Sequence, residues 1–192
     1  MSDAPPRDAR KPKPARADAR RNRERVLTAA RAAFAVEGPS VSLDDIARRA
    51  GVGAGTVHRH FPTKDELFKA VIADRLHELT TAARELAYAT EPGEAFFAFF
   101  HQLSAAARHN LALSAALASP VNTDNAVLDA GATLNDAVAD LLARAQATGA
   151  VRSDIDAADL HAIIAGALAM EERLTPGSQG RGLAVIVDGL RG

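Results

Sequence analysis

The side chains best suited to chemistry in this chain lie within residues 42–69, in the sequence SLDDIARRAGVGAGTVHRHFPTKDELFK. Residues 53–60 of this stretch are mostly short or polar and cannot all belong to a core. Hydroxyl, imidazole and guanidinium groups bind phosphates and the edges of bases. The residue types therefore predict hydrogen bonding and ion pairing to a nucleic acid, without bond making or breaking.

Three positions predict how this stretch folds. Ala47 is small enough for a second helix to approach closely, and Gly51 permits a tight turn because it has no Cβ. Val57 then packs the second helix against the first. We predict a helix-turn-helix, which presents its second helix to a DNA groove, and an ordinary helical hairpin is the alternative. The other apolar positions of this small core are Ile46, Ala50 and Val52.

The exposed face of the second helix gives the candidate DNA contacts. Small residues at its start let the backbone approach DNA, Thr56 can meet a base edge or a thymine methyl, and Arg59 can meet guanine or phosphate. His58 and His60 are two apart, point to different faces and make a poor metal pair, and packing is an equal alternative for His60. The predicted DNA-binding residues are Arg25, Ser42, Gly53, Ala54, Gly55, Thr56, His58, Arg59, His60 and Lys64.

The charge distribution supports a nucleic-acid partner for one end of the chain. The 192 residues carry a net charge of −1, but residues 1–70 carry +6 and residues 71–192 carry −7. A basic head on an acidic body indicates that the head alone meets a polyanion, although a chance imbalance of surface charge is the alternative. Residues 7–25 hold nine basic and three acidic side chains, which either contact phosphates or keep the segment soluble. Contact is favoured for residues 20–25.

Composition excludes several other classes of site. The chain has no cysteine, so disulfides, thiolate metal sites and cysteine nucleophiles are excluded. No apolar run approaches the ~20 residues of a membrane span, and the basic N-terminus lacks the apolar core of a signal peptide. We therefore expect a cytoplasmic, nucleoid-associated bacterial protein with no membrane partner.

The remaining periodicity predicts helices throughout. We expect an all-α fold with a basic disordered arm at 1–20, a three-helix DNA-binding head at 21–66 and a helical body at 67–192. Gly38 and Pro39 end the first helix, and Thr63 and Glu66 form a capping box that starts a long helix. The expected helices are 21–36, 43–50, 53–61, 64–89, 94–109, 110–119, 124–147, 156–174 and 182–190.

A set of residues across positions 21–72 stands in an order and spacing shared with a known family. The set comprises Ala29, Ala30, Phe34, Gly38, Ile46, Ala47, Ala50, Gly51, Val52, Gly55, Thr56, Phe61, Lys64, Asp65, Glu66 and Leu67. In these residues the chain resembles the TetR-family transcriptional regulators. Gly53 departs from the family's usual Ser, and His58 from its usual Tyr, which leaves the operator sequence open.

The resemblance implies a homodimer that binds a palindromic double-stranded DNA operator and senses an unidentified small-molecule effector, with no cofactor. It implies a repressor that the effector releases from DNA. An activator or an architectural DNA-binding protein without ligand sensing is the alternative. A small helical enzyme is a further alternative, although no paired carboxylates, metal-spaced histidines, phosphate loop or nucleophile motif stands out.

The resemblance also directs attention to two sets of body residues. An effector pocket is expected among residues 64–147, where a phenylalanine cluster is either core or pocket wall. The candidate ligand-binding residues are Phe96, Phe97, Phe100, His101, Asn122, Asp136 and His161. The last two helices are expected to form the dimer interface, with an intramolecular core contact as the alternative. The candidate interface residues are Ala162, Ala165, Gly166, Ala169, Leu183, Ile186, Val187 and Leu190.

Overall fold

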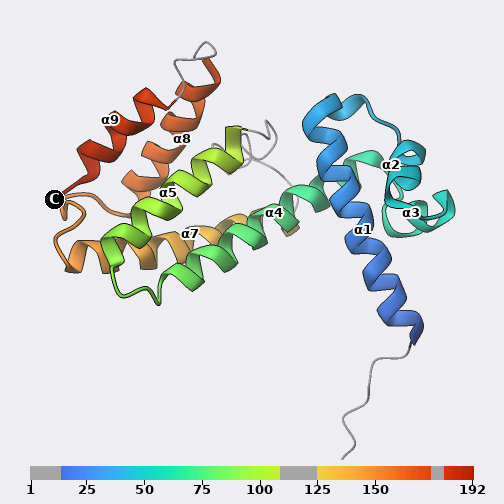
Figure 1. The fold of residues 1–192 in the computed structure, drawn as a ribbon, viewed down its shortest axis with the longest axis horizontal. Coiled ribbons are helices and arrows are strands. Elements are labelled where there is room, and N and C mark those ends of the chain that lie inside the picture. Colours follow the sequence, from blue (N-terminus) through green and yellow to red (C-terminus); the bar gives the residue numbers. More distant parts are fainter. Residues whose placement is uncertain (1–13, 109–124, 174–179) are drawn as a thin grey trace, which may run out of the picture. The chain divides into compact units, whose positions relative to one another are not determined.

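The computed structural model describes residues 14–108, 125–173 and 180–192, and these are helical with short connections, which confirms the all-α prediction (Figure 1). One isolated antiparallel bridge joins Val151 and Arg191 within the described chain. The helices are α1 (Pro14–Glu37), the 3-10 turn η1 (Gly38–Ser40), α2 (Leu43–Ala50), α3 (Ala54–His60), α4 (Lys64–Leu86), α5 (Pro92–Arg108), α7 (Asn125–Ala147), α8 (Ala157–Arg173) and α9 (Arg181–Leu190).

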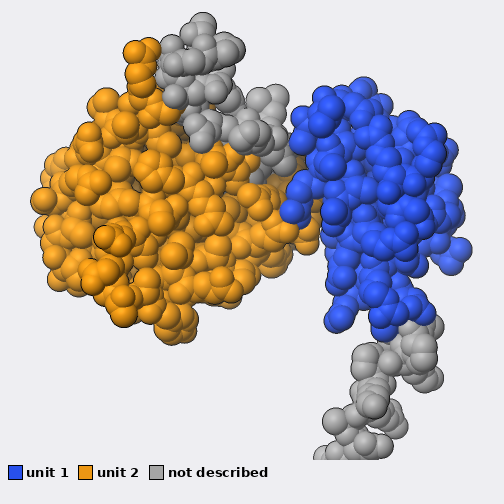
Figure 2. Space-filling model, in the orientation of Figure 1, with its two compact units in different colours: residues 1–64 blue, residues 65–192 orange. Residues whose placement is uncertain are grey.

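The chain separates into two compact units, residues 1–64 and residues 65–192, which are coloured separately in Figure 2. The first unit is called the head and the second the body below. The division falls two residues before the predicted start of the body. Helix α4 begins at Lys64, directly after Thr63, so this helix continues the chain from the head into the body.

Helix α1 begins at Pro14, earlier than the predicted start at residue 21. The prediction of disorder to residue 20 was therefore wrong for residues 14–20, and residues 1–13 lie outside the described residues. Alanine and arginine favour helix, and proline is tolerated in a first turn. Arg21 pairs with Asp18, and Arg20 lies 3.5 Å from Glu24, so charge pairs one turn apart support this end of α1.

The core of the head is built from α1, α2 and α3, which contact one another pairwise. Val26 and Ile46 are fully buried, and Val57 packs into the same small unit with no exposed surface. Ala47 is 2% exposed, which confirms its predicted place at the close approach of the two helices. The other buried apolar residues of the head are Leu27, Ala30, Ala33, Val41, Ala50 and Phe61.

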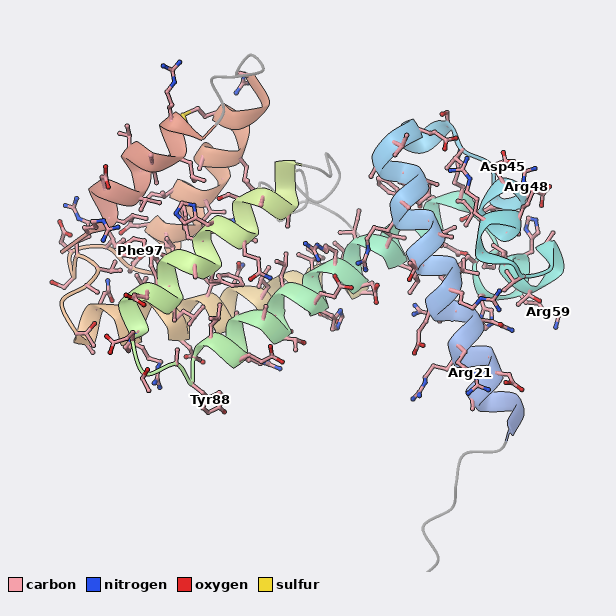
Figure 3. All side chains as sticks on the ribbon, in the orientation of Figure 1. Arg21, Asp45, Arg48, Arg59, Tyr88 and Phe97 are labelled. Carbon is pink, nitrogen blue, oxygen red and sulfur yellow. The ribbon has the colours of Figure 1, made fainter. Side chains whose placement is uncertain are left out.

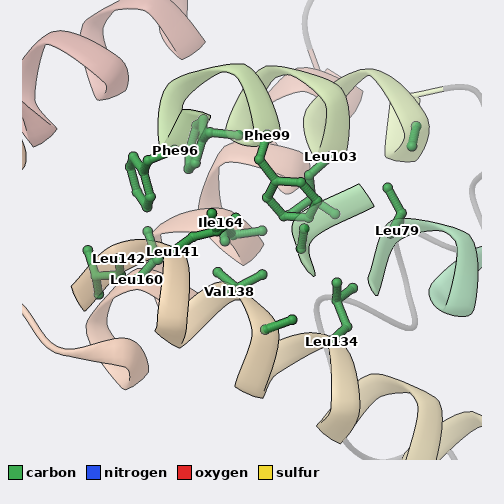
Figure 4. Packing of buried hydrophobic residues seen from close by; sticks show 14 of the residues in the cluster. Leu79, Phe96, Phe99, Leu103, Leu134, Val138, Leu141, Leu142, Leu160 and Ile164 are labelled. Atoms are coloured by element: carbon green, nitrogen blue, oxygen red, sulfur yellow. The ribbon is translucent and has the colours of Figure 1, made fainter. Parts of the chain in front are cut away.

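The body has one hydrophobic core to which α4, α5, α7, α8 and α9 all contribute (Figure 4). Helices α5 and α8 contact each other and both contact α7, while α9 packs on α8. Phe96, Leu134 and Leu160 are nearly inaccessible at its centre. Each fully buried apolar side chain contributes on the order of 1.5–3 kcal/mol, so this cluster supplies the main stabilisation of the body.

The connection between α7 and α8 is fixed by side-chain and backbone hydrogen bonds. Gln146 Nε2 donates to the carbonyl oxygens of Arg152 and Ile155, both at 2.9 Å. The backbone N–H of Arg152 donates to the carbonyl of Leu190 at 3.0 Å, which ties this connection to the end of α9. Within the described ranges, no helix is both long and apolar enough to cross a membrane.

Candidate nucleic-acid interface

The start of α2 is fixed by Ser42. The hydroxyl of Ser42 accepts from the backbone N–H of Asp45 at 3.1 Å and donates to Asp45 Oδ2 at 2.8 Å. The Ser42 hydrogen bond, reinforced by the charge of Arg48 at 2.5 Å, lowers the pKa of the Asp45 carboxyl below its usual value. Figure 3 shows Asp45 and Arg48 together on α2. Ser42 is therefore the N-cap of α2, and its hydroxyl is held in turn by the carboxylate of Asp45.

The turn after α2 depends on the left-handed conformation of Gly51, which has φ 62° and ψ 38°. The N–H of Gly51 donates to the carbonyl of Arg48 at 3.1 Å, and the N–H of Val52 donates to the carbonyl of Ala47 at 3.0 Å. These two bonds form a Schellman motif, which satisfies the last carbonyls of a helix when a residue without Cβ follows it. The predicted role of Gly51 is confirmed.

Three residues separate α3 from the end of α2, and backbone hydrogen bonds hold both ends of α3. Gly53 precedes it without a side-chain cap, and its carbonyl accepts from Thr56 N–H at 2.8 Å. At the other end, Phe61 is 3% exposed and its N–H donates to the carbonyl of Val57 at 2.8 Å. The guanidinium carbon of Arg23, on α1, lies 5.4 Å from the centroid of the Phe61 ring. Val57 and Phe61 thus face inward, and Ala54, Gly55, His58 and Arg59 of α3 are exposed to solvent.

The outward face of α3 carries most of the predicted contact residues. Thr56 and His60 are half-buried, and the ring of His60 lies 6.3 Å from that of Phe61. Arg59 is exposed, and its Nε donates to the carbonyl of Gly55 at 3.1 Å, which steadies the base of the side chain and leaves the terminal nitrogens outward (Figure 3). The remaining predicted residues on or beside this face are also exposed: Ser42, Gly53, Ala54, Gly55, His58 and Lys64.

The structure adds two contacts that sequence spacing did not reveal. His58 Nε2 lies 3.7 Å from Asp44 Oδ1, so a carboxylate of α2 lies beside the outward face of α3. Arg25, a predicted DNA contact, places Nη2 2.7 Å from the carbonyl oxygen of Gly51. Both contacts join residues far apart in the chain, and only the positions of α1, α2 and α3 relative to each other bring them together.

Helices α1 and α2 also enclose a groove of about 630 Å³ on the head. Its floor is small and apolar, and its rim is charged. Arg49 at this rim is paired with Glu37 at 2.5 Å, and this partner raises the pKa of Arg49. The lining residues are Arg21, Glu24, Arg25, Thr28, Ala29, Ala32, Arg49 and Ala50. This groove is separate from the effector pocket expected among residues 64–147, which stays a prediction.

In the body, the phenylalanine cluster is core. Phe96 and Phe100 are each 2% exposed, and Phe96 meets Phe97 edge to face at 5.3 Å between centroids. Phe97 is covered on one side by Arg191, whose guanidinium carbon lies 4.7 Å from its centroid (Figure 3). The polar candidates lie on separate helices: His101 on α5 and Asp136 on α7 are exposed, and His161 on α8 is half-buried. Asn122 lies outside the described residues.

The predicted dimer residues divide into two groups. Ala162 and Gly166 are exposed on α8, while Ala165, Ala169 and Ile186 are half-buried. Leu183, Val187 and Leu190 are only 3%, 5% and 2% exposed and belong to the core of the body. This burial agrees with the alternative prediction, an intramolecular core contact. Their spacing is the inward stripe of α9, and the exposed large apolar residue of this helix is Val185, at 72%. These three residues therefore lie on the inward face of α9, and the dimer interface itself stays a prediction.

Comparison with known proteins assigns both units of the chain. Residues 26–71 match the family model described as bacterial regulatory proteins of the tetR family, and residues 91–192 match the model for the C-terminal domain of SbtR-like transcriptional regulators. A TetR transcription regulatory protein from Mycobacterium vanbaalenii is 43% identical, with a TM-score of 0.73 over 93% of this chain and 100% of that one. A TetR transcriptional regulator from Streptomyces coelicolor is 32% identical, with a TM-score of 0.69 over 88% and 98%.

Shorter matches cover the head. The HTH-type regulator TtgW of Pseudomonas putida, described as uncharacterised, is 45% identical over 64 residues, 33% of this chain and 48% of TtgW. The HTH-type transcriptional repressor LfrR of Mycolicibacterium smegmatis is 43% identical over 67 residues, 35% of this chain and 34% of LfrR. This chain thus matches half or less of the length of these relatives.

The head contains a capped α2, a glycine turn and an outward-facing α3, and a separate helical body follows it in the chain. This organisation, with the match of residues 26–71, is that of a helix-turn-helix transcriptional regulator. With family models matching both units and a 43% identical structure matched over its full length, the chain belongs to the TetR family.

Proposed function

We propose that this protein is a homodimeric repressor that binds a palindromic operator through α3 and leaves it when a small molecule occupies the body. The observation that carries the proposal is the exposed face of α3. Thr56, His58 and Arg59 stand on it beside three residues too small to keep the backbone from DNA. Family members bind DNA operators, and the name of LfrR describes that relative as a repressor.

The contacts follow from the chemistry of this face. Arg59 is proposed to read guanine or hold a phosphate, and Thr56 to meet a base edge, because the small residues beside them let both side chains approach the groove. His58, His60 and Lys64, with the capped start of α2 at Ser42, are proposed to hold the flanking phosphates. The remaining proposed contacts are backbone approaches at Gly53, Ala54 and Gly55.

Dimerisation is proposed through the outer surface of α8 and α9. Ala162 and Gly166 lie four apart on α8, so they share one face, and neither keeps a second helix at a distance. Val185, an apolar side chain on α9, exposes 72% of its surface in the described part of the body. Burying this surface between two copies would give a dimer with two α3 helices for one DNA duplex, which is the arrangement typical of the family.

Release by an effector is proposed as a population shift. The dimer binds when its two α3 helices match successive major grooves, about 34–36 Å apart. Helix α4 begins in the head and continues through the core of the body, so a ligand in the body can bias the spacing of the heads through it. A differential affinity of a few kcal/mol suffices.

The test is selection of binding sites from random double-stranded DNA by the purified full-length protein. The proposal predicts enrichment of an inverted repeat whose half-sites are about 10 base pairs apart centre to centre, and loss of enrichment in an Arg59→Ala variant. Retention of all sequences alike would support an architectural DNA-binding protein instead. For the effector, compounds that raise the thermal stability of the protein must also lower operator affinity; stabilising compounds that leave affinity unchanged would defeat the release mechanism.

A further inference from the structure

Arg25 makes a contact that a DNA-binding arginine does not need. Its Nη2 donates to the carbonyl oxygen of Gly51 at 2.7 Å, across 26 residues of sequence. Gly51 is the left-handed residue that ends α2 and sets the direction of the chain toward α3. The side chain of α1 therefore binds the backbone of the helix-turn-helix at the residue where its two helices change direction.

The hydrogen-bond donor to the carbonyl of Gly51 comes from α1, outside the helix-turn-helix. The Schellman motif satisfies the carbonyls of Ala47 and Arg48 with the N–H groups of Val52 and Gly51, while the amides of Thr56 and Val57 donate to the carbonyl of Gly53. The carbonyl of Gly51 lies between these two sets, and Arg25 supplies its donor. A charge-assisted hydrogen bond of this length is stronger than one between neutral groups.

The guanidinium of Arg25 also fills the space beside Gly51. A Cβ on Gly51 would lie 2.6 Å from Arg25 Nη2, so the end of the arginine side chain would have to move away to admit it. The left-handed backbone of Gly51 favours glycine at this position, and any larger residue there would also displace the guanidinium from the carbonyl.

The base of Arg25 is held in place by the head core. The two residues that follow it, Val26 and Leu27, are 0% and 3% exposed, so α1 cannot rotate or slide at this point without exposing them. Arg23, two residues earlier, stacks over Phe61 at the other end of α3. One turn of α1 therefore touches the chain both before and after the recognition helix.

We propose that Arg25 is a positioning residue for operator recognition, which fixes the turn between α2 and α3 rather than binding a phosphate. The proposal rests on the proposed operator binding. The two roles predict different losses. A phosphate contact adds about 0.9 to the slope of log affinity against log salt and acts on all sequences alike. A positioning residue preserves that slope, and its removal weakens the operator complex more than the complex with unrelated DNA.

The experiment compares wild type, Arg25→Ala and Arg20→Ala on the selected operator and on unrelated DNA over a range of salt concentrations. Arg20 is the matched control because it lies on the same helix, carries the same charge and is 79% exposed beside Glu24, away from the turn. Arg25→Ala is expected to lose about tenfold in operator affinity, with the salt slope unchanged and affinity for unrelated DNA within about twofold of wild type. Arg20→Ala is expected to keep the ratio of the two affinities.

Amide hydrogen exchange without DNA gives a second, independent readout. Arg25→Ala is expected to accelerate exchange at Gly51 and Val52, while the amides of the body stay as in wild type. Equal losses on both DNAs with a salt slope reduced by about one would show a phosphate contact and overturn the proposal, as would wild-type operator affinity. If Arg25→Ala does not fold, Arg25→Met keeps an apolar stem without a charge or a donor, and equal losses on both DNAs with a reduced salt slope in that variant overturn the proposal. A wild-type protein that binds the operator no better than unrelated DNA would refute the proposed function. Amide hydrogen exchange at Gly51 and Val52 would still test whether Arg25 stabilises the turn.

Discussion

Two glycines of the head share a backbone conformation and differ in what surrounds them. Gly38 has φ 65° and no atom within 4 Å of a Cβ built on it, whereas Gly51 has φ 62° and meets Arg25 at 2.6 Å. Replacing either by alanine places a Cβ in the left-handed region, which costs about 1–2 kcal/mol. The difference between Gly38→Ala and Gly51→Ala therefore isolates the displacement of Arg25 from the turn.

The expected magnitudes follow from these contacts. Gly38→Ala should lower the stability of the head by about 1–2 kcal/mol. Gly51→Ala should cost a further amount of about 0.5–1 kcal/mol, since it also displaces the solvent-exposed guanidinium of Arg25 from its hydrogen bond. Gly55→Ala serves as the opposite control, because Gly55 lies within α3 with its nearest neighbour 4.0 Å from a Cβ. That variant should gain up to about 1 kcal/mol in helix stability.

The assay is native-state hydrogen exchange at the amides of Ile46 and Val57, which are buried in the head. It reports opening of the head separately from the body, whose amides provide an internal reference. Equal losses for Gly38→Ala and Gly51→Ala would refute the role of Arg25 at the turn. No loss for either would refute the left-handed conformation itself.

Four further outcomes follow from the structure. Ser42→Ala should lower the stability of the head by about 1 kcal/mol through loss of the cap. Because the pKa of Asp45 is lowered in the folded head, its contribution is present above about pH 4 and lost as the pH falls through the folded value, so acid titration should destabilise wild type more than Ser42→Ala. Arg59→Ala or Lys64→Ala should each weaken operator binding about tenfold with helicity and dimerisation retained, and unchanged affinity for both would show that the DNA face is misplaced. Val185→Asp should shift sedimentation toward monomer at micromolar concentration, and an unchanged dimer would place the interface elsewhere.

Sequence spacing was most informative where a local rule applies. Ala47, Gly51 and Val57 predicted the register of the helix-turn-helix because a close approach, a left-handed turn and an inward side chain each demand a particular residue type. The end of α1 and the cap of α2 were predictable for the same reason, since Gly38 and Ser42 act on the backbone beside them.

Spacing failed where two patterns have the same appearance. Residues 14–20 contain no large apolar side chain, so they resemble a disordered arm. Their alanines and paired charges nevertheless favour a helix that needs no hydrophobic core. Leu183, Val187 and Leu190 form an apolar stripe that suits an interface as well as a core, and only packing within the body distinguishes the two.

Long-range contacts of the site carry no sequence signal at all. The hydrogen bond from Arg25 to Gly51 and the approach of His58 to Asp44 depend on how α1, α2 and α3 pack together. Arg25 was therefore assigned to DNA by its charge alone, although in the structure its guanidinium donates to the backbone carbonyl of Gly51.

Operator recognition is proposed to need two α3 helices bound to one DNA duplex. Hydroxyl-radical footprinting of the full-length protein on the selected operator measures this arrangement. We expect two protected half-sites in inverted orientation, about one helical turn apart, and both should disappear in the Arg59→Ala variant. Continuous protection along the DNA, or a single half-site occupied without its mate, would contradict it.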